Sequence, residues 1–169
     1  NASIIHPSGI FGPNDFKPSL FGQEFINIAN GKRSYTVNIG YDYVDVRDLC
    51  ATAIKCIEKG EPKQNYIVGG NYIDFVGIGK VMSEKLNKQL IKGTFPFFFV
   101  YLSLPSSYLQ AVFFNKPRSA TLDSIHTVKV QNKLIPSNLA KEMLDHRPRP
   151  VDETINDTIE FFQERGLIN

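Results

Sequence analysis

The sequence predicts an α/β fold in which a few parallel strands alternate with helices. Three short runs rich in β-branched and aromatic residues, Ser3–His6, Tyr41–Val46 and Asn65–Val68, are each followed by turn or capping residues and then by helically spaced apolar residues. The 169-residue chain is 42% hydrophobic and 21% charged, which is ordinary for one globular domain that buries a core. This alternation favours parallel strands over a sandwich or a helical bundle.

The first strand and the first helix are separated by a loop. Ser3–His6 ends at a cluster of breakers, Pro7–Gly9, which predicts a loop at the C-terminal end of the strand. Ser19 stands directly before Leu20, where an amphipathic helical pattern begins. Asn30–Gly31 is expected to end this helix, because both residues tolerate the left-handed conformation that closes helices.

Two strand patterns and a second helix come next. Tyr35–Ile39 and Tyr41–Val46 alternate in strand fashion, and Gly40 between them predicts a turn or bend. Asp48 is expected to cap a helix over Leu49–Lys59. The predicted apolar face of this helix consists of Leu49, Ala53, Ile54 and Ile57.

The strand-then-helix order continues once more and is then replaced by helices. Asn65–Val68 predicts a short strand closed by Gly69–Gly70, and Asp74 or a residue near it begins a helix. Ser137 is expected to cap a short helix, and Asp152 is expected to open the last one.

One segment, Phe95–Phe114, is mostly apolar and free of charge over a length that would cross a bilayer. Pro96, Pro105 and Gln110 interrupt this apolar run. Proline breaks helices, and polar groups are costly in the lipid core, so the pattern favours a buried or partly exposed helix pair over a membrane-associated segment.

The composition argues against several kinds of partner. The net charge is only +2 and Lys and Arg form no run, so neither nucleic acid nor an anionic membrane is expected as a partner. Cys50 and Cys56 would point to different faces of a helix, which favours reduced thiols and a cytoplasmic location. No metal site is expected, because His6, His126 and His146 lack metal-ligand spacing.

Four motifs in a fixed order resemble the extended short-chain dehydrogenase/reductases. They are His6–Pro13, Tyr43–Asp48, Tyr66–Gly70 and Arg147–Pro150, the last standing before an amphipathic helix. Within that family the chain is most similar to the dihydroflavonol-reductase-like and NAD(P)-dependent epimerase-dehydratase branch. The resemblance covers nearly the whole chain but only about the C-terminal half of such an enzyme.

The resemblance implies how the chain is organised. It implies a single domain over 1–169 that is part of a larger Rossmann-type enzyme. Residues 3–70 would supply the last core strands and helices with an inserted substrate loop, and 71–169 would supply a mainly helical substrate-binding part. The N-terminal cofactor-binding half would lie upstream, and this missing half is expected to be a partner of the chain.

The resemblance also implies NAD or NADP as the cofactor of the whole enzyme. The sequence has no glycine-rich turn between a strand and a helix to receive the phosphates, and no tyrosine is followed four residues later by lysine. No catalytic residue is therefore assigned, and no cofactor is expected to bind tightly to this chain alone.

The cofactor contact implied by the resemblance is the turn that passes the nicotinamide, which corresponds to Pro7, Ser8, Gly9 and Ile10. Pro7 would stiffen the exit from the strand, and Gly9 would permit close backbone approach. The backbone N–H groups after Pro7 could then meet a carboxamide. A plain turn at the end of a strand is the alternative.

Lys17, Gln23 and Tyr41 are the candidate substrate-binding residues. Lys17 and Gln23 are polar groups near an apolar helix start and could hold a substrate oxygen, although a solvated helix start explains them equally well. Tyr41 stands where nucleotide-sugar members of the family carry an arginine for the diphosphate. A phenol cannot replace that bidentate pairing, so a smaller or more apolar carbonyl compound is expected.

These residues predict the substrate-binding portion of an NAD(P)-dependent oxidoreductase that acts on a small carbonyl or hydroxyl compound and is inactive alone. The alternatives are a fragment of a sugar epimerase or dehydratase, and a non-catalytic binding module that dimerises through strand edges left unpaired. Asp45, Arg47 and Asp48 are interpreted as a helix cap, Asp48, with its charge partner, rather than as a catalytic cluster.

Overall fold

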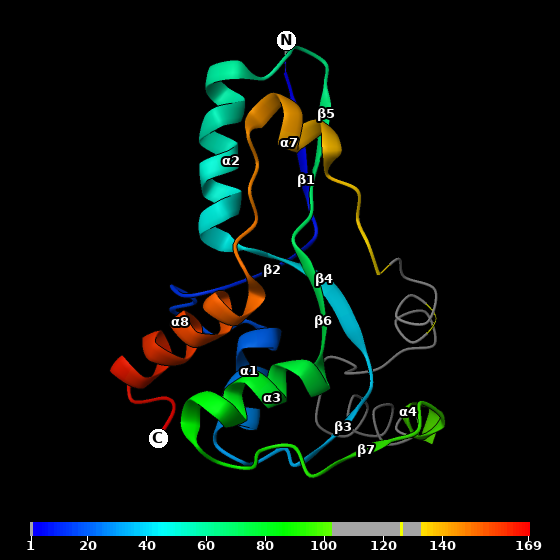
Figure 1. Cartoon of the computed structure of the whole chain (residues 1–169), viewed down its shortest axis with the longest axis vertical. Coiled ribbons are helices and arrows are strands. Elements are labelled where there is room, and N and C mark those ends of the chain that lie inside the picture. Colours follow the sequence, from blue (N-terminus) through cyan, green and yellow to red (C-terminus); the bar gives the residue numbers. More distant parts are fainter. Residues whose placement is uncertain (1, 103–125, 127–132) are drawn as a thin grey trace, which may run out of the picture.

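The computed structural model describes residues 2–102, 126 and 133–169, and the fold is given for these residues. The strands are β1 (Ile4–Pro7), β2 (Gly9–Phe11), β3 (Tyr35–Val37), β4 (Gly40–Asp45), β5 (Asn65–Val68), β6 (Asn71–Asp74) and β7 (Gly93–Phe95). The helices are α1 (Leu20–Ala29), α2 (Val46–Lys59), α3 (Phe75–Leu86), α4 (Phe98–Leu102), α7 (Asn138–Leu144) and α8 (Val151–Glu164). Figure 1 shows β1, β5, α2 and α7 at one end of the molecule and α1, α3 and α8 at the other.

Parallel pairing dominates among the strands, as the sequence predicts. β1 pairs with β5, β2 with β4 and β3 with β7, all in parallel. The exception is β6, which pairs antiparallel with β4. β6 was not predicted, because this four-residue strand begins with asparagine and ends with aspartate, two poor strand formers. The α/β class is confirmed, with one antiparallel strand added.

The β1–β5 pair has one covered face and one bare face. Tyr66 and Val68 of β5 are fully buried in a core that includes Leu144 of α7. The opposite face carries Ile4 and Ile67, which are both exposed, because alternate residues of a strand point to opposite sides. Within the described residues β1 pairs with β5 alone, so its other edge borders no described strand.

The helix after β4 begins earlier than predicted. Asp45, not Asp48, is the residue that precedes α2, and its side chain accepts a hydrogen bond from the backbone N–H of Arg47 at 2.8 Å. Val46 accordingly opens the helix and does not end the strand. The prediction failed because Asp45 and Asp48 are both good capping residues, and only the end of β4 decides between them.

The face that α2 turns toward the core is also partly different. Ile54 and Ile57 are 58% and 86% exposed, which corrects their assignment to the apolar face. Thr52 is buried, and Leu49 and Cys56 pack against the core of β5 and α7. At about 100° per residue, Ile54 lies opposite this narrow contact and Ile57 lies at its flank.

Of the predicted helix caps, Ser19 before α1 and Asp74 before α3 are confirmed, since each accepts a hydrogen bond from a backbone N–H three residues further on. Ser137 precedes α7 but makes no capping bond through its side chain. Asp152 does not open the last helix. Because Pro150 fixes the entry to α8, Asp152 lies inside the first turn, where its charge favours the helix dipole.

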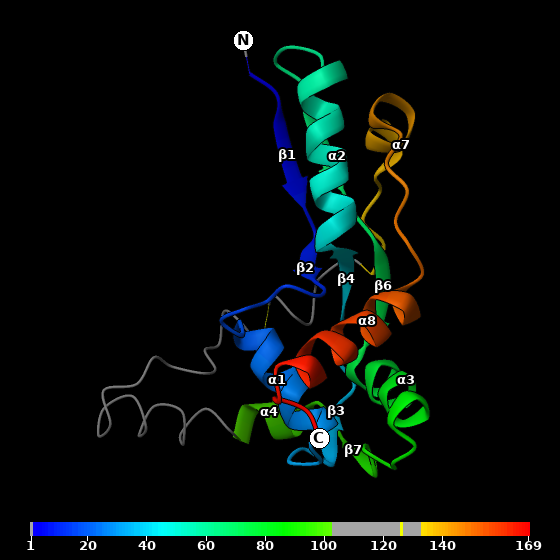
Figure 2. The same cartoon turned by 90° about the vertical axis from the view of Figure 1, so that its left-hand side faces the viewer.

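The helical end of the molecule is packed around aromatic rings. Phe11 of β2 meets Phe21 of α1 and Tyr43 of β4 edge to face, with ring centroids 5.3 and 5.2 Å apart. α1, α3 and α8 enclose this core together (Figure 2). Gly40 belongs to β4 and does not form the predicted bend. Glycine suits this position because a Cβ there would lie 2.6 Å from Cα of Asp74 in the paired strand β6.

Only part of the apolar segment Phe95–Phe114 falls within the described structure. Phe95 ends β7, and α4 covers Phe98–Leu102, while 103–114 lies outside the described residues. None of the helices in the described ranges has the length and apolar character needed to cross a bilayer.

Gly70 offers a test of the close approach between β4 and the chain between β5 and β6. A Cβ there would overlap the carbonyl oxygen of Tyr43. We expect Gly70→Ala to lower the free energy of unfolding by about 3 kcal/mol or more, because backbone cannot move aside as a side-chain tip can. Gly31→Ala, at a φ of +70° with open space around it, should cost about 1 kcal/mol. Urea denaturation measures both losses of unfolding free energy. Equal losses would contradict the close backbone approach at Gly70.

Candidate functional site

The predicted cofactor turn, Pro7–Ile10, is a short link between two strands. Pro7 ends β1, and Gly9 and Ile10 begin β2. The backbone N–H of Ser8 donates to the carbonyl of Val68 at 3.0 Å. The N–H of Ser8 is therefore already bonded, and contact of the N–H groups after Pro7 with a carboxamide stays a prediction.

The hydroxyl of Ser8 is the polar group that remains at this link. Its oxygen is buried and has no hydrogen-bond partner among the described residues. A buried hydroxyl without a partner is costly, so such a group is a candidate for contact with a ligand. Gly9 has a different explanation from the one predicted: a Cβ there would lie 2.9 Å from the Tyr43 ring, so glycine is required by packing of β2 on β4.

A cavity of about 280 Å³ begins where the link ends. Its walls come from β2 and the loop after it, the first half of α1, the start of α2, and α8. The lining residues are Ile10, Phe11, Gly12, Pro13, Asn14, Asp15, Ser19, Phe21, Gly22, Phe25, Val46, Thr158 and Phe162. Four phenylalanine rings make the lining largely apolar, as in most small-molecule sites.

A few polar groups edge the cavity. Asp15 accepts a hydrogen bond from the backbone N–H of Ser19 at 2.8 Å, and the Ser19 hydroxyl accepts one from Gly22 at 3.0 Å. The Ser19 hydroxyl keeps a proton to donate. The Thr158 hydroxyl donates to the carbonyl of Thr154 at 2.6 Å and is less available.

Of the predicted cofactor and substrate residues, Ile10 alone is in the lining of this cavity. Ile10 lines the cavity, whereas Lys17 and Gln23 are exposed and lie outside its lining. Tyr41 is half-buried on β4, with its ring 5.9 Å from that of Tyr43. Burial raises the pKa of Tyr41, so its phenol stays neutral and can donate a hydrogen bond. Substrate binding by Lys17, Gln23 and Tyr41 stays a prediction.

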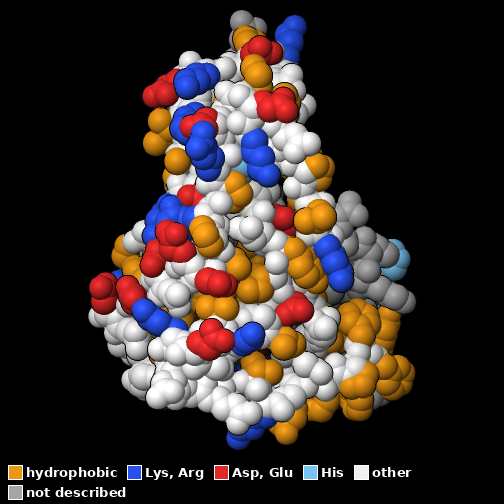
Figure 3. All heavy atoms as spheres, in the orientation of Figure 1, with side chains coloured by type: hydrophobic (Ala, Val, Ile, Leu, Met, Phe, Trp, Pro, Cys, Tyr) orange, Lys and Arg blue, Asp and Glu red, His pale blue; other side chains and the backbone are white. Residues whose placement is uncertain are grey.

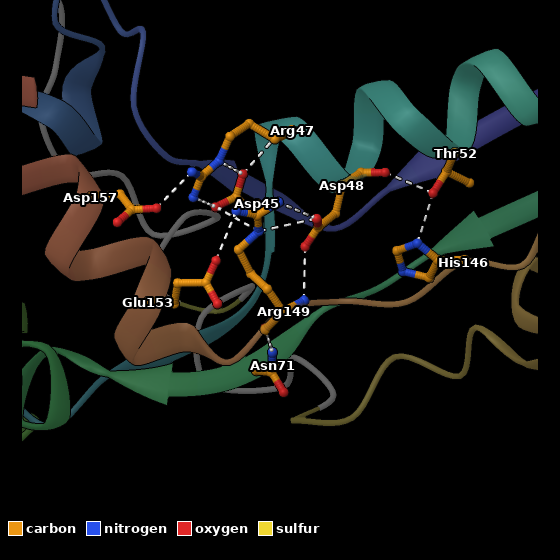
Figure 4. A network of polar contacts seen from close by, with 9 residues as sticks. All are labelled: Asp45, Arg47, Asp48, Thr52, Asn71, His146, Arg149, Glu153 and Asp157. Carbon is orange, nitrogen blue, oxygen red and sulfur yellow. Dashed lines mark hydrogen bonds and ion pairs between the residues drawn. The ribbon is translucent and has the colours of Figure 1, made fainter.

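Beside the cavity lies a network of charged groups at the start of α2, drawn in Figure 4. The Asp45 carboxylate, whose side chain is 1% exposed, accepts hydrogen bonds from Nε and Nη2 of Arg47 at 2.9 and 2.7 Å. Nη1 of Arg47 donates to Asp157 of α8 at 2.6 Å. The hydrogen bond and charge of Asp45 raise the pKa of Arg47, which therefore keeps its proton.

Arg149 completes this network from the residues before α8. Its backbone N–H and its Nη2 each donate to Asp48 at 2.8 Å, and its Nη1 donates to Glu153 at 3.0 Å. Its carbonyl accepts a hydrogen bond from the side chain of Asn71 in β6 at 2.8 Å. Asp48 is therefore an ion-pair partner and not the helix cap, and the charged cluster joins α2, β6 and α8 rather than facing the cavity.

The histidine built into the core is His146, which the sequence analysis treated only as one of three scattered histidines. It is 2% exposed, and its Nε2 donates to the carbonyl of Gly69 at 2.7 Å because a carbonyl can only accept. Its Nδ1 lies 2.8 Å from the hydroxyl of Thr52. His6 is exposed, with Nε2 3.3 Å from Oδ1 of Asn65. The contacts of His146 with Thr52 and Gly69 are distant in the sequence, so no local pattern predicts them.

Arg149 and Arg147, two residues apart, form a matched pair for testing the network. Arg149 is 23% exposed and binds the carboxylates of Asp45 at the end of β4 and Asp48 in α2, whereas Arg147 is 84% exposed and pairs with Asp145 at the surface. We expect Arg149→Ala to lower the free energy of unfolding by about 3 kcal/mol, because buried carboxylates lose their partner. Arg147→Ala should cost about 0.5 kcal/mol or less. Similar losses for the two variants in urea denaturation would show that the ion pairs of Arg149 do not stabilise the fold more than a surface pair does.

Asp45 makes the stability depend on pH. Burial alone would raise the pKa of Asp45, but hydrogen bonds from the side chain and backbone of Arg47 outweigh burial and hold it below its ordinary value. A carboxyl group whose pKa is lower in the folded state stabilises at higher pH, and this stabilisation is lost as the pH falls through the folded value. We expect the free energy of unfolding to decline below about pH 4, and less steeply in Asp45→Asn.

Urea denaturation at several pH values between about 2 and about 6 measures this decline. Glu58→Gln changes an exposed carboxyl group on the same helix and should keep the wild-type slope. A slope in Asp45→Asn as steep as in the wild type would contradict the role given to Asp45.

Comparison with known proteins gives a consistent picture. No family model matches the sequence. The chain is 26% identical over 99% of its length to "Sterol demethylase protein B" of Methylococcus capsulatus, covering 52% of that protein. It is 23% identical over 98% of its length to a dihydroflavonol 4-reductase-like protein of Synechocystis, covering 49%. The chain therefore spans about half the length of these relatives.

Solved structures share the fold. The crystal structure of gox2253 superposes with a TM-score of 0.80 at 25% identity, over 99% of this chain and 51% of that one. A nucleoside-diphosphate-sugar epimerase of Pseudomonas aeruginosa, PA4631, superposes with a TM-score of 0.73 at 17% identity, over 99% and 49%. The predicted fold, the C-terminal part of a Rossmann-type epimerase or reductase, is confirmed.

Proposed function

Because the chain is a homologue of the C-terminal part of extended short-chain dehydrogenase/reductases, we propose that it forms the substrate-binding side of an NAD(P)-dependent oxidoreductase. The substrate would be a small carbonyl or hydroxyl compound. One observation carries the proposal: the link with the unpartnered Ser8 hydroxyl runs directly into the wall of the apolar cavity at Ile10. A group held at Ser8 and a compound held in the cavity would thus be neighbours.

The residues of the link fit a nicotinamide better through a side chain than through the backbone. The Ser8 hydroxyl can donate to or accept from a carboxamide, and exposed Ile10 offers apolar contact to a ring. When bound, the nicotinamide would supply or accept the hydride. The phosphates would need a glycine-rich turn of the kind that this sequence lacks. The chain by itself would therefore orient the substrate and exclude water without turning it over.

The bare side of the β1–β5 pair supports a partner that supplies the rest of such a site. β1 has an edge that no described strand occupies, and Ile4 and Ile67 are exposed beside it. An N-terminal half that adds a parallel strand to β1 would satisfy the open edge and cover both isoleucines. A second copy of the chain pairing edge to edge is the alternative, and would make the protein a homodimeric binding module.

The shape and chemistry of the cavity favour an apolar ring compound. Phe11, Phe21, Phe25 and Phe162 surround a volume of about 280 Å³, which suits one or two rings. No Lys or Arg lines this cavity, so a diphosphate would have no cationic partner there. The two relatives named above are called after a sterol and a dihydroflavonol, which supports a reductase of apolar carbonyl compounds over a sugar epimerase or dehydratase.

Ligand titrations followed by NMR test the cavity. We expect acetophenone, a small aromatic ketone, to shift the methyl signals of Val46 in the cavity wall, whereas UDP-glucose should not. Ile10→Trp should abolish these shifts by filling the cavity, and Ile57→Trp, a matched change on the exposed side of α2, should leave binding intact. Acetophenone shifts confined to other regions would contradict the substrate site.

Calorimetry with NADH and NADPH accompanies this experiment. The chain alone should bind neither more tightly than about 1 mM, since the groups that hold the phosphates are not in this sequence. Tighter binding would mean that the division of the cofactor site between two halves is wrong.

A further inference from the structure

A group of exposed aromatic rings covers the end of the molecule opposite to β1 and β5. Its members, called here the aromatic surface, are Tyr35, Phe95, Phe98, Phe99 and Tyr101, and their exposed fractions run from 38% to 65%. They come from β3, β7 and α4, and Figure 3 shows hydrophobic side chains gathered over this corner. Soluble proteins seldom expose so many neighbouring large rings unless something covers them.

Strand pairing and ring stacking fix the positions of the rings in the aromatic surface. β3 and β7 pair in parallel, which sets Val37 opposite Phe95. The rings of Tyr35 and Phe95 stack with centroids 5.4 Å apart, and Phe95 lies 5.5 Å from Phe99. Strand pairing therefore holds the rings on the outside in a fixed arrangement, although turning them inward would bury apolar area.

The two segments that carry the aromatic surface contain cationic side chains but no carboxylate side chain, although Glu24, just before the first segment, pairs with Arg33 at 3.1 Å. No Asp or Glu occurs between Glu24 and Asp42, the segment that contains β3, or between Glu84 and Asp123, the segment that contains β7 and α4. Lys32 in the first segment and Lys92 in the second are exposed. The small net charge of the chain conceals this separation, because its carboxylates lie in other segments.

Rings bordered by lysines fit a lipid interface better than a second copy of the chain. Aromatic side chains favour the boundary between headgroups and acyl chains, and lysine side chains reach toward anionic headgroups. A symmetric dimer through the same surface would bring the two sets of lysines together and leave them without carboxylate partners.

We propose that the aromatic surface docks this end of the protein on the interface of a bilayer that contains anionic lipid. The rings enter the boundary region, and Lys32 and Lys92 face the headgroups. Such contact lies in the plane of the interface and needs no helix that spans the membrane. The proposal stands apart from the proposed oxidoreductase function, since none of its residues lines the cavity.

Vesicle co-sedimentation of the 169-residue chain tests the proposal. The probes are vesicles of phosphatidylcholine alone and of phosphatidylcholine with about 30% phosphatidylglycerol, at low and high salt. We expect binding to the anionic vesicles, weakened by salt. Phe98→Ser/Phe99→Ser should reduce the partition coefficient about tenfold or more, because two rings no longer enter the interface.

Two further variants keep the outcome clear. Lys92→Gln should weaken binding to the anionic vesicles about fivefold and leave phosphatidylcholine binding unchanged. Ile57→Ser removes an apolar side chain that is 86% exposed at the far end of the molecule and should bind like the wild type. Each variant is first shown by circular dichroism to keep the wild-type melting temperature.

Three results would overturn the proposal. They are absence of binding to the anionic vesicles, equal loss in Ile57→Ser, and light scattering that shows a dimer dissociated by Phe98→Ser/Phe99→Ser. The last result would assign the aromatic surface to a second copy of the chain. Because the NMR titration with acetophenone needs no lipid, failure here leaves the test of the oxidoreductase function untouched.

Discussion

The buried carboxylate of Asp45 is the constraint on which the site depends. A carboxylate that is almost fully removed from water is tolerable only when cations and hydrogen-bond donors surround it. Arg47 supplies most of them, and Arg149 adds its guanidinium at 3.4 Å. Since Arg47 also holds Asp157 of α8, the end of β4 is fixed to the last helix. Val46 and Thr158, the neighbours of these residues in the chain, are both walls of the cavity.

The chemistry that the chain can contribute follows from which polar groups are already in use. Tyr43 serves the core, packed between Phe11 and Tyr41, and burial raises its pKa far above neutrality. The arginines and carboxylates of the charged network bond to one another and are not directed at the cavity. The polar groups that remain at or beside the cavity are the hydroxyls of Ser8 and Ser19 and the side chains of Asn14 and Asp15. Hydroxyls and amides orient a carbonyl or carboxamide well but are poor general acids, which agrees with the proposed role of positioning the substrate.

Local signals made part of this structure predictable. Ser19 and Asp74 precede clear helical patterns, so their caps could be read from neighbouring residues. The pairing of Arg149 with Asp48 spans 101 residues, so no neighbouring residue indicates it. The motif Arg147–Pro150 contains Arg149 but does not reveal its partner. The outward position of Ile54 and Ile57 was equally hidden, because it depends on how little of α2 the narrow β1–β5 pair can cover.

The two exposed apolar faces differ in the kind of partner that their physics permits. The face on β1 and β5 is aliphatic and borders an unpaired strand edge, whose N–H and C=O groups can pair with a further strand. A lipid boundary offers no such partner. The aromatic surface carries its rings on the β3–β7 pair and α4, and lysines stand in the same segments, so it favours apolar contact together with negative charge. Because the two faces lie at opposite ends (Figure 1), occupation of one leaves the other free.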